Sequence, residues 1–241
     1  MHLNKKLFSC GVVAILTLSM SASAETAVSG KQYLESVQQV ISSTLKKVSP
    51  SIVYMELSMK KPGRASTIAL NGMILDKKGH IATLYFKESD VNDIKVWIGE
   101  QEFQAKIVKT DRINGLSFVK IESDDETVPV SFADTSKLNT GQFVIGISAT
   151  SKNIAFEPVA NLGTLKAVVE GSRDYILVNG FATVHSQDIP TYGMPIVNLD
   201  GEIIAWSQGR SIGLIDNTAK AIEKFLKRKE KKMLPMMKNH G

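Results

Sequence analysis

Short runs of β-branched and other apolar residues, separated by turn residues, fill most of the chain between residues 51 and 207. Turn sequences at 76–79 and 199–201 join neighbouring runs as hairpins. Many short strands at roughly 8–12-residue spacing are typical of an all-β barrel or sandwich. The runs lie at 51–57, 72–75, 80–86, 94–98, 103–108, 116–121, 142–148, 163–169, 175–178, 195–198 and 202–207. The sequence therefore predicts an all-β domain.

Helical spacing of apolar residues appears at the two ends of this β region. The first stripe ends before Ser49 and Pro50, and its apolar residues are Leu34, Val37, Val40, Ile41, Leu45 and Val48. The second predicted helix covers 217–231, with Ala219, Ile222, Phe225 and Leu226 on one side. We expect one β domain flanked by two helices.

The first residues have the pattern of a secretory signal peptide. A basic start with Lys5 and Lys6 precedes an apolar run at 7–20 and small residues up to Ala24. Cleavage after Ala24 would remove Cys10, the single cysteine of the chain, so the mature protein would contain no disulfide. We therefore expect a periplasmic or secreted protein with four parts: signal peptide 1–24, helical segment 25–48, β domain with its closing helix 49–231, and a basic, Met-rich tail 232–241.

The formal net charge of +5 is unevenly distributed along the chain. Two of the positive charges lie in the predicted signal peptide, and the region from 217 onward holds eight Lys or Arg residues against two Glu residues. The remainder, 25–216, is mildly acidic, which argues against nucleic acid as a partner of the folded domain. An anionic membrane surface could instead contact the basic end through Lys227, Arg228, Lys229, Lys231 and Lys232.

Five stretches resemble, in order, the protease domain of HtrA/Deg-type serine proteases. They are 48–53 (VSPSIV), 72–83 (GMILDKKGHIAT), 102–111 followed by 116–121, 133–145 (ADTSKLNTGQFVI) and 193–204 (GMPIVNLDGEII). The resemblance implies the trypsin-like double β-barrel, with a cleft between the barrels. Members of this family often continue into a PDZ domain, which we do not expect here because the chain ends at Gly241.

The catalytic positions implied by the resemblance lack the catalytic residue types. Phe86 stands where the family has the base histidine, and Gly115, beside Asn114, stands where it has the orienting aspartate. In the motif that holds the nucleophilic serine, Tyr192 takes the serine position, and Pro190 takes the position of a glycine whose N–H helps to form the oxyanion hole. Such a triad needs a hydroxyl, an imidazole and a carboxylate in fixed roles, so we expect no catalytic residue.

No other set of residues replaces the triad in the sequence. We expect His80 to be a solvated turn residue, and His185 cannot pair with Ser186, because neighbours on an extended strand point to opposite faces. The acidic residues at 124–126 have no metal-ligand spacing and indicate a solvated loop. We expect neither a metal nor another cofactor.

These patterns favour an exported pseudoprotease that binds unfolded or extended peptides, or an active protease relative, in a chaperone-like or regulatory role. Homo-oligomers are compatible with this hypothesis. Phe86 and Tyr192 either fill an abandoned cleft or line a binding groove, and the sequence leaves both interpretations open. Two other hypotheses remain: an active serine-type endopeptidase with rearranged catalytic residues, and a membrane-surface adaptor that works through the basic tail.

Overall fold

The computed structural model describes residues 30–60, 66–123, 125–169, 175–181, 186–208, 212–214, 219 and 221–227. The predicted signal peptide and the predicted tail at 232–241 lie outside the described residues. No helix among the described residues is long and apolar enough to span a membrane.

The first half of the chain forms a closed barrel with the strand order β1-β2-β3-β6-β5-β4. Its side chains alternate between the two faces of each strand, so that Val53, Met55 and Leu57 are buried in the barrel core. The strands are β1 (Ile52–Met59), β2 (Ser66–Ile74), β3 (His80–Leu84), β4 (Val91–Ile98), β5 (Gln101–Asp111) and β6 (Leu116–Ile121).

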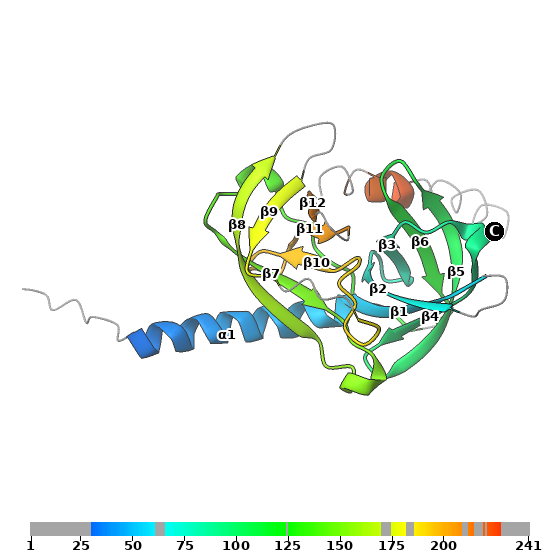
Figure 1. The fold of residues 1–241 in the computed structure, drawn as a ribbon, viewed down its shortest axis with the longest axis horizontal. Coiled ribbons are helices and arrows are strands. Elements are labelled where there is room, and N and C mark those ends of the chain that lie inside the picture. Colours follow the sequence, from blue (N-terminus) through cyan, green and yellow to red (C-terminus); the bar gives the residue numbers. More distant parts are fainter. Residues whose placement is uncertain are drawn as a thin grey trace, which may run out of the picture.

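The second half forms another closed barrel, with the order β10-β11-β12-β9-β8-β7, and Figure 1 shows the two barrels side by side. An apolar cluster joins them, because Met73 and Phe118 of the first barrel pack with Ile147 and Trp206 of the second. The strands are β7 (Phe143–Ser148), β8 (Val159–Val169), β9 (Tyr175–Asn179), β10 (Pro195–Val197), β11 (Ile203–Ser207) and β12 (Ile212–Leu214).

Helices lie at both ends of the described chain. Helix α1 (Gly30–Val48) projects away from the barrels at its N-terminal end (Figure 1). Its other end is fixed to the β10–β11 turn, where Thr44 Oγ1 donates to the Leu199 carbonyl at 2.7 Å and Lys47 Nζ to the Asp200 carbonyl at 2.6 Å. Residues 219 and 221–227 are helical, within the predicted 217–231. The described part of the chain also contains four short 3₁₀ helices: η1 (Ser49–Ser51), η2 (Glu88–Asp90), η3 (Thr135–Lys137) and η4 (Lys152–Ile154).

The predicted all-β fold with terminal helices is confirmed, and each predicted run lies in or overlaps a strand. Strand β12 was missed by the sequence analysis. It has three residues with a glycine in the middle, and so short a segment carries no alternation that a pattern could detect.

The C-terminal helix is held to the first barrel by aromatic contacts of Phe225. This ring stacks on Phe118 of β6 with 4.2 Å between the ring centroids, and it meets the His80 ring edge-on at 5.7 Å. Phe225 is only 4% exposed. The helix therefore covers an open end of the inter-barrel core.

We expect Phe225→Ala to lower the free energy of unfolding by ~3–5 kcal/mol, because it leaves a cavity where a buried ring was. Urea denaturation followed by far-UV circular dichroism measures this loss. The matched control is Lys224→Ala, an exposed position of the same helix, which should change stability by less than about 0.5 kcal/mol. Equal effects of the two substitutions would contradict the docking of this helix.

Candidate functional site

Phe86, at the position that the resemblance assigns to the base, lies two residues beyond the end of β3. Its side chain is 8% exposed and belongs to the core of the first barrel. Its backbone N–H donates to Ser117 Oγ at 3.0 Å, which ties it to β6. A phenyl ring has no proton acceptor, so this position performs packing.

Gly115, at the position assigned to the aspartate, precedes β6 and lies beside the Phe86 segment. Its carbonyl accepts the Tyr85 N–H at 2.9 Å, and its φ of +70° is easy only for glycine. A Cβ here would meet nothing closer than the Gln208 amide, at 3.8 Å. A side chain would therefore fit at this position, but the backbone conformation disfavours any residue other than glycine.

Asp111, at the end of β5, is the carboxylate nearest to Gly115 in the chain. It accepts hydrogen bonds from the Asn114 side chain at 3.0 Å and the Asn114 N–H at 3.2 Å, and Lys109 Nζ lies 3.4 Å away. Its burial alone would raise its pKa, but the Asn114 hydrogen bonds and the Lys109 charge outweigh it and lower the pKa. Asp111 is thus an ionised anchor of the β5–β6 turn.

Tyr192, at the serine position, lies in a segment that is fixed to the first barrel. Its carbonyl accepts the Asn71 N–H at 2.8 Å, and its partly buried side chain packs on the apolar cluster that contains Phe86. Gly193 has φ +72°, and a Cβ there would lie 2.5 Å from the Asn71 carbonyl oxygen, so this residue must be glycine. The structure thus brings the side chains of Phe86 and Tyr192 to one cluster.

The side chain of Asn71, on β2, connects the two barrels. It is fully buried, and its Nδ2 donates to the carbonyls of Pro190 at 2.5 Å and Tyr192 at 3.3 Å. Its Oδ1 accepts the Ala149 N–H at 2.9 Å. Ser148 Oγ donates to the same Pro190 carbonyl at 2.9 Å. The Pro190–Tyr192 segment is therefore held by its backbone, independently of the side chains it carries.

The role of Asn71 was not predicted from the sequence. The available signal was a single amide in the otherwise apolar end of a strand, at 69–74. A buried polar side chain needs hydrogen-bond partners, so such a residue indicates a structural junction.

The prediction that His80 is a solvated turn residue is wrong. His80 is 5% exposed, and its Nδ1 lies 2.7 Å from Asp76 Oδ2. The turn at 76–79 is as predicted. After Gly79 the chain enters the protein interior, where the His80 ring packs edge-on against Phe225. His80 begins β3 and its ring packs against Phe225, whereas Phe86 lies beyond the other end of this strand, in the apolar cluster with Tyr192.

The other candidate residues remain apart from the site. Asp125 and Glu126 are exposed, as expected, and Glu126 pairs with Lys77 at 2.9 Å. Asp124, His185 and the basic residues Arg228, Lys229, Lys231 and Lys232 lie outside the described residues. Lys227 is described, and its ammonium pairs with Glu223 one turn earlier. The described residues contain no group of three or more His, Cys, Asp or Glu that could hold a metal ion.

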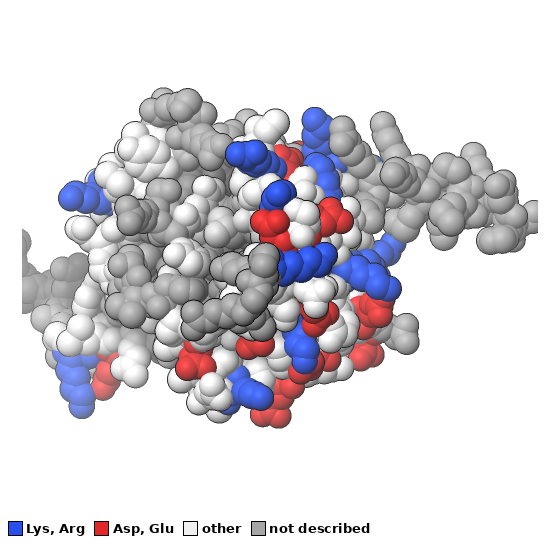
Figure 2. All heavy atoms as spheres, turned by 45° about the vertical axis from the view of Figure 1, so that its right-hand side comes forward, with Lys and Arg blue, Asp and Glu red and all other residues white. Residues whose placement is uncertain are grey.

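Charged side chains of both signs cover the first barrel. Figure 2 shows Lys and Arg interspersed with Asp and Glu on the face that comes forward there. Many of them form exposed ion pairs, such as Lys95–Glu102, Lys106–Glu122 and Lys77–Glu126. Exposed pairs of this kind contribute little to stability, and they leave this face with mixed charge.

Comparisons with known proteins agree with this fold. Serine protease HTRA4 of Mus musculus is 25% identical over 172 residues, which cover 68% of this chain and 35% of that protein. Probable periplasmic serine endoproteases described as DegP-like are 27% identical in Rickettsia prowazekii, covering 66% of this chain and 33% of theirs, and 24% identical in Marinomonas sp., covering 80% and 40%. The chain thus spans about a third to two fifths of the length of these relatives. No family model matches it.

Deg5 is a similar protein among the solved structures. Its crystal structure matches with a TM-score of 0.63 and 21% sequence identity, covering 78% of this chain and 94% of that one.

We expect Asn71→Leu to lower the free energy of unfolding by at least ~1–3 kcal/mol, because the buried Ala149 N–H loses its acceptor. Thermal and urea denaturation measure the loss. Asn92→Ala, at an exposed position of β4, is the control and should have little effect. A stable Asn71→Leu variant would show that this amide does not hold the barrels together.

The Asp76–His80 pair predicts a pH-dependent contribution to stability. Burial alone would raise the Asp76 pKa, but hydrogen bonds from His80 and Lys78 outweigh it and hold the pKa below its usual 3.8. The contribution is therefore present above pH 3.8 and disappears as the pH falls through the lower pKa of the folded state.

We expect Asp76→Asn to destabilise the protein at pH 7 by ~1.5–3 kcal/mol, and the difference from the wild type to shrink below pH 4. Urea titrations from pH 7 to pH 2.5 measure it, with the exposed Asp125→Asn as control. A difference that stays constant with pH would refute the assignment.

Sequence similarity and fold thus converge on one conclusion: this chain is a relative of the HtrA/Deg-type serine proteases and has their trypsin-like double β-barrel.

Proposed function

We propose that this chain is a catalytically inactive HtrA/Deg relative that acts by binding peptides or proteins. The observation that supports this most directly is the composition of the site. Phe86, Gly115 and Tyr192 stand at the positions that the resemblance assigns to the triad, and the side chains of Phe86 and Tyr192 pack in one apolar cluster.

The chemistry of acyl transfer needs groups that these residues lack. Neither Phe86 nor Gly115 can accept a proton or orient a base. A tyrosine hydroxyl such as that of Tyr192 needs a base to become a nucleophile, and the Phe86 ring supplies none. Pro190 has no N–H for the oxyanion, and the loss of one such donor costs about 2.7–4 kcal/mol of transition-state stabilisation.

Binding a peptide requires fewer specific chemical groups than cleaving one does. Extended peptides are commonly held by main-chain hydrogen bonds to strand edges, with pockets for alternate side chains, and no catalytic group takes part. Asn71 holds the carbonyls of Pro190 and Tyr192, so this segment keeps its backbone conformation without the side chains of a triad. Chaperone-like holding of unfolded chains, or regulation of an active relative by joining its oligomer, are the two concrete forms of this role.

The cell envelope is the proposed location. The pattern of 1–24 is that of a signal peptide, and similar proteins in Rickettsia prowazekii and Marinomonas sp. carry names that describe them as periplasmic. A function in envelope protein quality control would suit a protein of this kind.

Labelled casein tests cleavage and binding in one assay. We expect saturable binding by fluorescence anisotropy, with the casein still intact on a gel after prolonged incubation. Tyr192→Phe is the matched control, because it removes the hydroxyl and keeps the ring. The variant should bind as the wild type does.

Two results would contradict the proposal. Casein fragments produced by the wild type and not by Tyr192→Phe would make Tyr192 a nucleophile. Fragments produced equally by both would place an active site elsewhere in the chain.

A further inference from the structure

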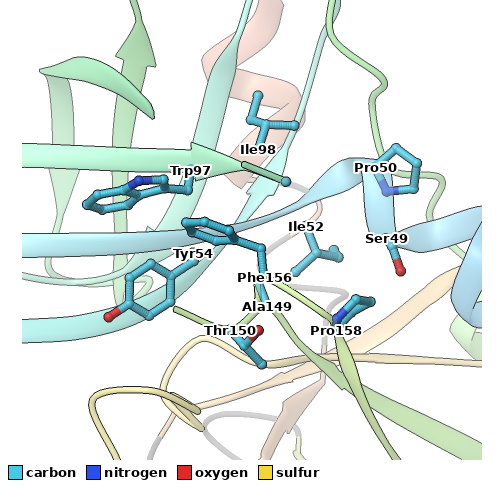
Figure 3. Close-up of a pocket in the computed structure, with 11 residues that line it drawn as sticks. Ser49, Pro50, Ile52, Tyr54, Trp97, Ile98, Ala149, Thr150, Phe156 and Pro158 are labelled. Carbon is cyan, nitrogen blue, oxygen red and sulfur yellow. The ribbon is translucent and has the colours of Figure 1, made fainter. Parts of the chain in front are cut away.

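A pocket of about 360 Å³ lies between the two barrels. Its walls come from η1, β1 and the end of β4 in the first half of the chain and from the segment between β7 and β8 in the second. Figure 3 shows the rings of three residues, from both barrels, gathered at one end of it. The main lining residues are Ile52, Tyr54, Trp97, Ile98, Phe156 and Pro158. Ligand pockets typically occupy 300–1,000 Å³ with linings of this apolar kind.

The lining does not suit a charged or strongly polar ligand. Among the described residues, no charged side chain lines the pocket. Its hydroxyl hydrogens already have acceptors: Ser49 donates to the Leu45 carbonyl at 2.6 Å, Thr150 to the Glu157 carbonyl at 2.8 Å, and Tyr54 to the Gln187 carbonyl at 2.7 Å or to Glu56 at 3.0 Å. A ligand that needs hydrogen bonds or a counter-charge would give up its hydrating water on entering this pocket, and no side chain there would replace those interactions.

The backbone that positions Phe156 is strained. Ala155 and Phe156 have φ of +52° and +55°, and no other described non-glycine residue has a positive φ. L-amino acids avoid this region, and such strain persists where the surroundings enforce it, often at ligand sites. Here the start of the loop is tied down, because Ser151 Oγ and Asn153 Nδ2 both donate to Asp188, at 2.6 and 2.9 Å.

Two of the lining rings already form an aromatic pair. Tyr54 and Trp97 lie 5.5 Å apart with an interplanar angle of 58°. Aromatic pairs prefer such tilted or offset geometries at 4.5–7 Å, and a further ring entering between the two walls can adopt the same geometry.

We propose that this pocket binds an uncharged aromatic side chain presented by an extended peptide. The lining includes none of Phe86, Gly115, Pro190 and Tyr192, so the proposal stands independently of whether the cleft hydrolyses anything.

Trp97 is a built-in reporter of occupancy. The chain has two tryptophans, and Trp206 is fully buried, so Trp206→Phe leaves Trp97 as the single indole fluorophore. The probes are acetylated, amidated pentapeptides Gly-Gly-X-Gly-Gly with X as Phe, Leu, Lys or Asp. We expect saturable emission changes with the Phe peptide and at least tenfold weaker binding of the Lys and Asp peptides. Isothermal titration of the wild type repeats the comparison without the Trp206 substitution.

Matched glycine variants test the role of the ring. Phe156→Gly removes the ring and relieves the backbone strain, and we expect it to fold and to bind the Phe peptide at least tenfold more weakly. Ala155→Gly relieves strain and keeps the ring, so binding should stay within twofold of the wild type. Trp97→Leu, on the opposite wall, is the second variant and should also weaken binding at least tenfold by calorimetry.

Three outcomes would overturn the proposal. They are no saturable binding of the Phe peptide, binding of the Lys peptide as tight as that of the Phe peptide, and wild-type affinity in both Phe156→Gly and Trp97→Leu. Tight binding of the Lys peptide would indicate a cation–π cage instead. None of these outcomes bears on casein cleavage, so failure here is distinguishable from failure of the proposed function.

Discussion

The buried carboxamide of Asn71 determines how the two barrels meet. Its Nδ2 and Oδ1 satisfy the Pro190 and Tyr192 carbonyls and the Ala149 N–H, which belong to two separate segments of the second half of the chain. Unpaired polar groups at such depth are costly, so the junction is specified by geometry and not only by apolar area. The apolar cluster around Phe118 and Trp206 then supplies the bulk of the contact between the barrels.

This arrangement separates the scaffold from the chemistry. The segment at the nucleophile position is held through its main chain, and Gly193 is required there because Asn71 approaches so closely. Phe86 and Tyr192, at the positions that the resemblance assigns to the base and the nucleophile, pack in one apolar cluster, and the fold is similar to that of Deg5. Fold alone does not imply function, and the site residues carry the argument for binding.

The sequence predicted what depends on local pattern. Alternation and turn residues located the strands, except β12, which is too short to show a pattern. The resemblance supplied the double barrel and the positions of Phe86, Gly115 and Tyr192. It could not supply contacts between distant segments, such as the Asn71 junction or the pocket around Trp97 and Phe156. His80 was misjudged because a turn sequence says where the chain reverses but not which element later covers it.

The most direct test of the central claim is labelling of the purified protein with a fluorophosphonate, read by intact mass. This reagent reacts with a hydroxyl nucleophile that a neighbouring base activates. Phe86, at the position that the resemblance assigns to the base, cannot act as one. The account predicts that the mass stays unchanged under conditions that fully label an active HtrA-type protease. Stoichiometric labelling of any serine, threonine or tyrosine would contradict it.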